Sequence, residues 1–339
     1  MIQIGYTHGS KASLQISRSI AFYADLFQES AHLDWAGVSK LALDFQPSIE
    51  KQWPDYLEEM RGVADGAAVD LPSIIALNVR TEITFGLFSD GCTALSWRPP
   101  NSNTSYLAQN WDWMTPQQQN LIILNIQQTG KPDIKMVTEA GLIGKIGLNS
   151  AGVGVCLNAI KAAGVSKERI PCHLGLRKVL DSWSCEEAVQ ALEKTGVASS
   201  CHMLVADPTG GIGLEWSSID CVKVHMNDKG QVFHTNHYLL PHAKGVHDTN
   251  WLKDSNFRVK RIEELCGKLD GGGAPTGAQI ASLFTDEKNA PNSICREQTG
   301  DSKTGTLFNI VMELGGSKPR ARVVLGRPTE PEEVVDLVF

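Results

Sequence analysis

The sequence lacks the marks of a secreted or membrane-bound protein. No apolar run among its 339 residues reaches the ~18 residues that a membrane helix requires. Residues 1–10 do not combine a basic segment with an apolar one, so we expect no secretory signal peptide. The last three residues, Leu-Val-Phe, differ from the SKL type of peroxisomal tripeptide. We therefore expect a cytoplasmic protein without a membrane partner.

Three other patterns are missing. The eight cysteines include no CxxC pair, which argues against a disulfide framework and favours reduced thiols. Acidic residues outnumber basic ones by 38 to 31, and the net charge of −7 does not favour a nucleic-acid partner. The glycine-rich stretch 141–155 lacks the GxGxxG spacing of a dinucleotide loop. Turns and close sheet packing explain its glycines better.

The first ninety residues carry helical periodicity. Residues 4–10 predict a turn into an amphipathic helix, capped by Ser10 or Ser13, whose inner face is Ile16, Ile20, Tyr23 and Phe27. A second helix is expected to begin at Pro54, where the missing N–H of proline is not needed, and to end near Gly66. A third helix is expected to open at residues 70–72.

From Cys92 onward the pattern changes to strands interrupted by helices. We expect strands at residues 92–97, 106–112, 121–127, 134–139, 142–147, 153–158, 203–206, 213–216, 221–225, 231–235, 306–312 and 320–325. Helices are expected at residues 173–181, 185–194, 256–269 and 276–284. Residues 121–124 are apolar on both sides, which favours sheets covered on both faces. The pattern predicts an α+β fold in one domain, and a four-layer αββα sandwich is compatible with it.

The change from helix to strand falls at Asp-Gly-Cys, residues 90–92. At such a point a precursor can cut itself if the Cys92 thiol attacks the Gly91 carbonyl, because glycine tolerates a strained backbone. The cut would leave Cys92 with a free α-amine of pKa about 7.7–8, suited to take the proton of the thiol at neutral pH. One residue would then supply both nucleophile and base. Taken alone, the tripeptide is more often an ordinary turn beside a buried thiol.

Three later stretches carry polar residues that would serve Cys92. Asp112 stands between two tryptophans in QNWDW, residues 109–113, and a buried carboxylate needs partners. Asn236 in HTNH, residues 234–237, has an amide N–H that would donate to an oxyanion. Arg296 in NSICR, residues 292–296, would hold a carboxylate substrate or balance Asp112. For each residue alone, a structural hydrogen bond is the stronger interpretation.

The two histidines of HTNH raise the question of zinc. A zinc site requires third and fourth ligands at suitable spacing, and the sequence offers none. Histidines three positions apart on a strand also point to opposite faces. We therefore expect no metal site.

In combination, these motifs resemble those of the fungal acyl-coenzyme A:isopenicillin N acyltransferases and their relatives. The resemblance runs almost from end to end, and the order and spacing of the motifs make it specific. It is carried by IGYTHGS (4–10), WPDYLEEMRGVADGA (53–67), LNVRTE (77–82), DGCTA (90–94), QNWDW (109–113), TEAGLIGKIGLNSAGVGV (138–155), HTNH (234–237), NSICR (292–296), TLFNI (306–310) and LGRPT (325–329).

The resemblance implies an N-terminal-nucleophile hydrolase with the αββα fold, made as a precursor that cuts itself between Gly91 and Cys92. It implies a helical α chain, residues 1–91, and a β chain, residues 92–339, that stay associated. By motif, Cys92 matches the nucleophile and Asn236 the oxyanion-hole residue. Asp112 and Arg296 match the polar pair that positions the cysteine amine and the substrate.

The resemblance also implies a ping-pong reaction without a bound cofactor. The Cys92 thiolate would open an amide, such as that of isopenicillin N, or an acyl-coenzyme A thioester, which serves as co-substrate. An amine such as 6-aminopenicillanic acid, or water, would then collect the acyl group.

The missing peroxisomal tripeptide indicates an acyltransferase-like paralogue outside the peroxisome, whose amide is another peptide or secondary metabolite. Two further alternatives belong to other classes. One is an uncleaved, inactive binding protein that kept the fold, and the other is a dinucleotide-dependent enzyme built on residues 141–155.

Overall fold

Helices make up the beginning of the chain. The computed structural model describes residues 1–84, 91–269, 273–300, 302–316 and 318–339. The first of these ranges contains α1 (Ile2–Lys11), α2 (Ser13–Ala31), α3 (Trp35–Leu43), α4 (Gln46–Gln52), α5 (Pro54–Ala67), α6 (Leu71–Asn78) and α7 (Arg80–Thr84). Asp34 and Asp70 accept N-cap hydrogen bonds at the starts of α3 and α6. Each cap satisfies a backbone N–H that a helix start leaves unpaired.

Helices α1 and α5 pack with their backbones in contact. A Cβ on Gly5 would lie 1.9 Å from the carbonyl oxygen of Glu59, and one on Gly62 would lie 2.1 Å from that of Ile2. The other glycines of this contact are Gly9 and Gly66. The close approach lets two helices with small faces bury each other, which explains why the glycine-rich residues 4–10 are helical.

Six strands form the first sheet. In spatial order they are β10 (Gln231–His234), β1 (Gly91–Trp97), β2 (Tyr106–Met114), β11 (Thr304–Glu313), β12 (Arg320–Arg327) and β13 (Glu330–Val338). All neighbouring pairs in this sheet are antiparallel. Strand β1 lies between β10 and β2, but its pairing with β10 includes only residues 94–97, so Cys92 is opposite a residue of β2 alone.

Seven strands form the second sheet. Their order is β3 (Leu121–Ile126), β4 (Ile134–Glu139), β5 (Ile146–Asn149), β6 (Gly154–Ala159), β7 (Cys201–Asp207), β8 (Gly210–Trp216) and β9 (Cys221–Val224). A short 3₁₀ helix, η1 (Thr115–Asn120), connects β2 of the first sheet to β3 of the second. Strand β3 is at the edge of its sheet.

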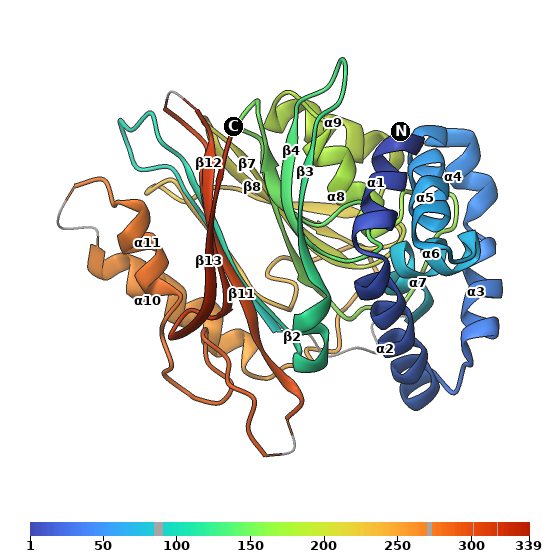
Figure 1. Ribbon diagram of the computed structural model, residues 1–339. Coiled ribbons are helices and arrows are strands. Elements are labelled where there is room, and N and C mark those ends of the chain that lie inside the picture. The colour runs from blue at the N-terminus through green and yellow to red at the C-terminus, as the bar shows by residue number, and fades with distance from the viewer. Residues whose placement is uncertain (85–90, 270–272, 301, 317) are drawn as a thin grey trace.

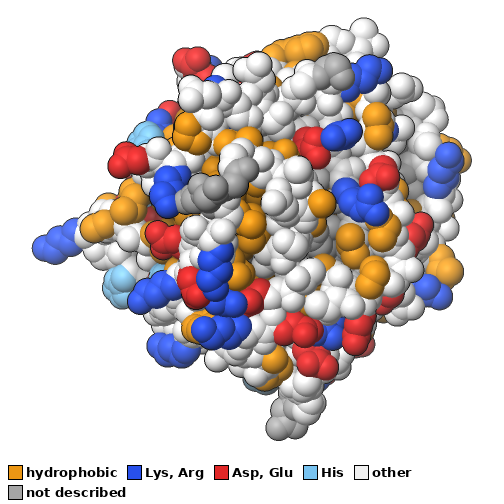
Figure 2. Space-filling model, turned by 90° about the vertical axis from the view of Figure 1, so that its left-hand side faces the viewer, with side chains coloured by type: hydrophobic (Ala, Val, Ile, Leu, Met, Phe, Trp, Pro, Cys, Tyr) orange, Lys and Arg blue, Asp and Glu red, His pale blue; other side chains and the backbone are white. Residues whose placement is uncertain are grey.

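The elements stack in four layers, which Figure 1 shows from the side. Helices α10 (Ser255–Leu269) and α11 (Gly277–Leu283) cover the outer face of the six-stranded sheet, and the two sheets face each other. Helices α8 (Cys172–Leu180) and α9 (Cys185–Thr195), with the N-terminal helices, lie on the far side of the seven-stranded sheet. Figure 2 looks onto the α10 and α11 side, where charges of both signs are interspersed with apolar side chains.

The side chains of β1 alternate between two hydrophobic cores, one on each face of the strand. Cys92 and Ala94 belong to the large core that includes the space between the sheets. Leu95 and Trp97 belong to a smaller core with Ile262 of α10 and other residues of α10 and α11. Residues of a strand alternate between its two faces, so β1 is buried on both. The expected α+β sandwich is therefore the observed fold.

Several local expectations were wrong. Residues 4–10 are in α1 instead of a turn, and the residue before α2 is Ala12, so neither Ser10 nor Ser13 caps that helix. Residues 142–147 form a strand only from Ile146. The sheets are covered on both faces as expected, but residues 121–124 themselves are only half-buried, because β3 is an edge strand. Helices α3 and α4 and strand β13 were not expected.

Other expectations were confirmed within one to three residues. They include the starts of α5 and α6 and the helices α8 to α11. Within the described residues, no helix has both the length and the apolar content needed to cross a membrane.

Candidate active site

Cys92 is the second residue of β1 and is fully buried. It is opposite Trp111 of β2, while Gly91 is opposite Asp112. The side chain of Cys92 lies on the face of β1 that meets the large core. Asp90, the first residue of the expected cleavage motif, lies outside the described residues. All eight cysteines are described, and none of them forms a disulfide.

Two side chains hold the backbone of Cys92. Its N–H donates to Oδ1 of Asn236 at 2.8 Å, and its carbonyl accepts from Nη1 of Arg258 at 2.6 Å. Arg258 also donates to Oδ1 of Asn236 at 2.9 Å. Cys92, Asn236 and Arg258 form a closed hydrogen-bond network that includes the N–H of the Gly91–Cys92 peptide and the carbonyl of the Cys92–Thr93 peptide. A buried network of this kind fixes the orientation of the groups it joins.

The amide of Asn236 is turned so that its oxygen faces Cys92. Its Nδ2 donates one hydrogen to the carbonyl of Ala159 at 3.0 Å. An amide nitrogen carries two hydrogens, and the second has no partner among the described residues. The oxyanion contact expected for Asn236 therefore depends on this second N–H, while its oxygen binds the nitrogen of Cys92.

Ser255 supports Asn236 from behind. Its Oγ accepts from the backbone N–H of Asn236 at 2.7 Å and lies 2.7 Å from Nδ1 of His237. It also exchanges a hydrogen bond of 2.8 Å with the hydroxyl of Thr235. Ser255 is the first residue of α10, so this helix start positions the segment that follows β10.

Asp112 and Arg296 meet beside Gly91. Nε of Arg296 lies 3.4 Å from Oδ2 of Asp112, and the hydroxyl of Thr306 donates to Oδ1 of Asp112 at 2.6 Å. A Cβ added to Gly91 would lie 2.9 Å from Nε of Arg296 and 3.0 Å from Oδ2 of Asp112. Burial raises the pKa of Asp112 to about 7, and this effect outweighs the opposing pull of Arg296 and Arg258.

Asp254 links the two arginines of the site. Its Oδ2 accepts from Nε of Arg258 at 2.7 Å and from Nη2 of Arg296. Burial opposes ionisation of Asp254, but Arg258 and Arg296 outweigh it and lower its pKa. The carboxylate of Asp254 therefore balances the charges of two buried arginines. Both the hydrogen bond from Arg258 to the Cys92 carbonyl and the ion pair of Arg296 with Asp112 depend on it.

The structure brings all four expected site residues into one cluster. Cys92 touches Asn236, and Asp112 touches Arg296 next to Gly91. Three further members, Arg258, Asp254 and Ser255, were not found from the sequence. The only signal was an acidic residue four positions before an arginine at a helix start, and this pattern usually marks an exposed ion pair.

The side chains of the two histidines of HTNH make different contacts. Nε2 of His234 pairs with Oε1 of Glu215 at 2.8 Å, and its ring stacks on that of His202 at 3.5 Å. His237 instead contacts Ser255. Among the described residues, no group of three His, Cys, Asp or Glu side chains is arranged to hold a metal ion.

Solved structures define the class of the fold. An N-acylethanolamine-hydrolyzing acid amidase orthologue from Caenorhabditis elegans matches with a TM-score of 0.51 and 18% identity, over 67% of this chain and 94% of that chain. Penicillin V acylase from Agrobacterium tumefaciens matches with a TM-score of 0.51 and 15% identity, over 73% of this chain and 86% of that one. Both are N-terminal-nucleophile hydrolases in fold, and this chain shares that fold.

Sequence comparison gives the family. The family described as acyl-coenzyme A:6-aminopenicillanic acid acyl-transferase matches residues 97–330. An acyl-coenzyme A:6-aminopenicillanic-acid-acyltransferase 40 kDa form from Emericella nidulans is 40% identical over 341 residues, covering 99% of this chain and 93% of the relative. The chain belongs to this family, and its enzyme class is acyltransferase.

Proposed function

We propose that the protein is a self-processing cysteine acyltransferase that also hydrolyses amides. The main support for the proposal is the pair of side-chain hydrogen bonds to the backbone of Cys92. A buried cysteine has its N–H bound by Asn236 and its carbonyl bound by Arg258. The pairing of β10 with β1 begins only at Ala94, so these two groups are bound by side chains and not by a neighbouring strand. Here the groups that would become the amine and the first carbonyl of a new chain already have dedicated partners.

The proposed cleavage begins with attack of the Cys92 thiol on the carbonyl carbon of Gly91. A carbon–sulfur bond forms, the Gly91–Cys92 peptide bond breaks, and the proton of the thiol passes to the nitrogen. Water then hydrolyses the thioester, which leaves a carboxylate on Gly91 and a free thiol and α-amine on Cys92. The oxygen of Asn236 already binds that nitrogen and would keep the new amine in place.

Acyl transfer would use the same groups. The α-amine of Cys92 would take the proton of the thiol, and the thiolate would attack an amide or an acyl-coenzyme A thioester. The second N–H of Asn236 would donate to the oxyanion in both halves of the reaction. Asp112 and Arg296, next to Gly91, would position the amine and a carboxylate on the substrate.

The substrate class follows from the relatives. Acyl-coenzyme A and 6-aminopenicillanic acid appear in the names of both the family and the Emericella nidulans protein. We infer an acyl-coenzyme A or an amide as donor, and a β-lactam amine of the 6-aminopenicillanic acid type, or water, as acceptor. An amide of another peptide or secondary metabolite is the alternative donor.

The first test is the mass of the purified protein beside two variants, Cys92→Ala and Cys156→Ala. Cys156 is an equally buried thiol of β6 and serves as the matched control. We expect the wild type and Cys156→Ala to give chains of roughly 10 and 27 kDa, the shares of 36.9 kDa that fall to residues 1–91 and 92–339. The larger chain should begin at Cys92, and Cys92→Ala should stay whole. A single uncut chain in all three samples would favour the inactive binding protein.

The second test separates transfer from hydrolysis. The cleaved protein is incubated with hexanoyl-coenzyme A, with and without 6-aminopenicillanic acid, and both the released thiol and the acylated amine are measured. A transferase gives the acylated β-lactam, whereas an enzyme that only hydrolyses its acyl-enzyme releases the coenzyme A thiol at the same rate in both mixtures and forms no acylated amine.

A further inference from the structure

The segment that carries Asn236 leaves the sheet just before it reaches Cys92. The pairing of β10 with β1 ends where His234 is opposite Ala94. In a continued antiparallel ladder, position 236 would be opposite Cys92. Here the side-chain oxygen of Asn236 accepts from the N–H of Cys92 instead. Strand pairing therefore does not fix the position of Asn236, and other contacts must do so.

Glu215 binds the chain on both sides of Asn236. It is fully buried and is the residue before the last of β8. Its Oε1 lies 2.8 Å from Nε2 of His234 and accepts from the backbone N–H of Leu239 at 2.6 Å. Its Oε2 accepts from the backbone N–H of Leu240 at 3.3 Å. One carboxylate therefore closes this segment into a loop that contains Asn236.

The contact between Glu215 and His234 is an ion pair. Burial would raise the pKa of Glu215, but hydrogen bonds from His234 and from the two backbone N–H groups outweigh it and lower the pKa. An ionised carboxylate can only accept, so Nε2 of His234 donates to it. Nδ1 of the same ring lies 2.8 Å from the carbonyl oxygen of Thr235, which also can only accept. Both ring nitrogens therefore carry a hydrogen, and hydrogen bonds between charged groups are the stronger ones.

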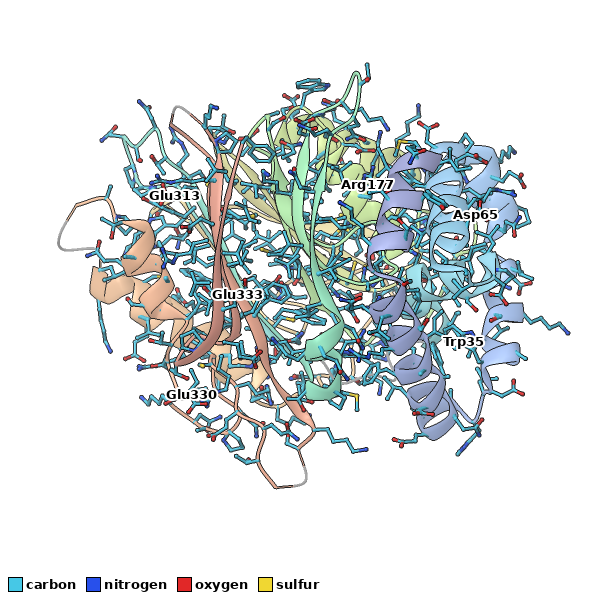
Figure 3. The ribbon with its side chains drawn as sticks, in the orientation of Figure 1. Trp35, Asp65, Arg177, Glu313, Glu330 and Glu333 are labelled. Carbon is cyan, nitrogen blue, oxygen red and sulfur yellow. The ribbon has the colours of Figure 1, made fainter. Side chains whose placement is uncertain are left out.

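The seven-stranded sheet supports this pair from below. Asn158, His202 and Glu215 are directly opposite one another on β6, β7 and β8, and side chains fill the layer between the two sheets (Figure 3). Nδ1 of His202 lies 3.0 Å from Oδ1 of Asn158, and its ring stacks on that of His234 with 10° between the planes. Burial, together with the charge of His234, lowers the pKa of His202 well below its ordinary value. His202 is therefore a neutral, flat support for the charged ring.

We propose that Glu215 is a positioning residue for Asn236. Ser255 binds the backbone N–H of Asn236, but one hydrogen bond fixes a distance and not an orientation. The contacts of Glu215 on either side of Asn236 fix the orientation as well. They keep its oxygen on the nitrogen of Cys92 and direct its second N–H to the oxyanion. This role rests on the proposed function, because only acyl transfer gives that N–H an oxyanion to bind.

Glu215→Gln tests this role with little change of shape. A carboxylate accepts with both oxygens, whereas an amide has one accepting oxygen and one donating nitrogen. Glutamine therefore cannot accept from His234, Leu239 and Leu240 together, and at least one contact with the loop is lost in either orientation of the amide.

Asp207→Asn is the matched control. Asp207 is a buried carboxylate at the other end of the β7–β8 hairpin. It accepts from the backbone N–H groups of Cys185 and Thr209 at 2.8 Å each, on segments that do not carry Asn236. The substitution removes the same kind of contact without touching the loop.

The first measurement is hydrogen exchange of the amide of residue 92, followed by NMR in the full-length, uncut Cys92→Ala protein. We expect Glu215→Gln to speed this exchange at least about tenfold, because Asn236 no longer holds the N–H, and Asp207→Asn to leave it unchanged. The amides of residues 94–97 report general loosening of β1 and should not change. An unchanged rate at residue 92, or an equal increase at residues 94–97 or in Asp207→Asn, would overturn the proposal.

The second measurement is acyl transfer from hexanoyl-coenzyme A to 6-aminopenicillanic acid, with rates expressed per cleaved molecule. An oxyanion donor acts in the transition state, so Glu215→Gln should lower kcat by about 10–100-fold and leave KM nearly unchanged. Asp207→Asn should match the wild type. A raised KM with an unchanged kcat would refute the positioning role. A wild type that transfers no acyl group would refute the proposed function, while the exchange of residue 92 still decides whether Glu215 holds Asn236.

A second pair of variants, His234→Gln and His234→Leu, tests the same contact if Glu215→Gln does not fold. Glutamine places an N–H donor near the position of Nε2 and can still bind Glu215, whereas leucine cannot. In the uncut Cys92→Ala protein, we expect the exchange of residue 92 to stay near the parent rate in His234→Gln and to rise in His234→Leu. Equal rates in the two variants would show that the hydrogen bond to Glu215 does not hold the loop.

Discussion

At the scale of single residues, position 91 has no room for any side chain larger than that of glycine. Its backbone φ is not among the left-handed values, so the need for glycine does not come from strain. It comes from the polar cluster, because a Cβ would lie 2.9 Å from Nε of Arg296 and 3.0 Å from Oδ2 of Asp112. The strained backbone that the attack itself would require stays a prediction, and the structure adds a steric reason for glycine at the same residue.

This contact predicts the effect of Gly91→Ala on cleavage. The methyl group would push the guanidinium of Arg296 away from Asp112 and shift the peptide bond that Cys92 is proposed to attack. We expect cleavage to slow by about 100-fold, because small displacements of reacting groups cost that much. The rate is measured from the two-chain fraction on denaturing gels over time. Gly305→Ala is the matched control, since its Cβ meets only ordinary contacts of 3.5 Å or more, and it should cleave at the wild-type rate.

Asp112 predicts a pH dependence of stability. Burial raises its pKa from the ordinary value of 3.8 to about 7 in the folded protein. Between these pH values the folded chain keeps a proton that the unfolded chain has released. The contribution of Asp112 to the free energy of unfolding is therefore fully present below about pH 3.8, and it is lost as the pH rises through about 7.

The measurement is urea unfolding of Cys92→Ala and of Cys92→Ala with Asp112→Asn, from pH 4 to pH 8. The free energy of unfolding of the first protein should fall relative to the second over this range. Asparagine does not titrate, so a constant difference would show that Asp112 is ionised in the folded protein throughout.

Three of the four site residues named from the sequence, Cys92, Asp112 and Asn236, lie at or near a strand end, and Arg296 joins them from the segment before β11. Their partners could not be found in this way. Arg258 and Asp254 are in an ordinary charged helix start, and Ser255 is one of many serines. Their importance arises only when α10 packs on β1 and brings Arg258 to the Cys92 carbonyl. Sequence periodicity contains no information on such contacts between distant elements.

At the scale of elements, α1 and α5 depend on glycine. Gly62→Ala would place a Cβ 2.1 Å from the carbonyl of Ile2, and the obstacle is backbone that cannot rotate away. We expect a loss of about 1–3 kcal/mol or more in the free energy of unfolding. Denaturant midpoints in the uncut Cys92→Ala protein provide the measurement.

Gly267→Ala is the control for this prediction. Gly267 also lies within a helix, α10, and a Cβ there meets nothing within 4 Å. This variant should gain about 0.4–1 kcal/mol, because alanine restricts the unfolded chain more than glycine does. Equal losses in both variants would mean that the helix contact is not responsible.

The elements that were predicted correctly have strong periodicity, such as the helical face from Ile16 to Phe27 in α2. Those that were missed depend on tertiary contacts. Residues 4–10 have poor helix-forming composition, yet they are helical because Gly5 and Gly9 fit α5. Strand β13 is rich in acidic residues, and it forms because the exposed edge of β12 pairs with it.

At the scale of the whole molecule, a buried ion cluster connects the segments on either side of the proposed cleavage. Glu139 of β4 accepts hydrogen bonds from Tyr23 of α2 and Arg80 of α7. It also accepts from Lys145 at 2.9 Å, within its own segment. Burial alone would raise the pKa of Glu139, but Arg80 and Lys145 outweigh it and lower the pKa to about 2.

This cluster would hold the α and β chains together after cleavage, and Glu139→Gln should weaken their association. The substitution leaves Arg80 and Lys145 buried without their carboxylate, at a cost of about 3–5 kcal/mol. We expect the chains of this variant to separate at a lower urea concentration in gel filtration. Glu50→Gln, which removes an exposed partner of Arg61, should change nothing measurable.

At low pH the difference between the wild type and Glu139→Gln in chain association should disappear. A carboxyl whose pKa falls on folding contributes stability above its unfolded pKa, here the ordinary value of 4.5, and loses it as the pH falls through about 2. The gap between wild type and Glu139→Gln in the urea needed for separation should therefore shrink from pH 5 toward pH 2. A gap that stays constant over this range would mean that Glu139 does not carry its charge in the assembled molecule. The contact between the chains would then depend on the apolar packing of the helices and not on the ion cluster.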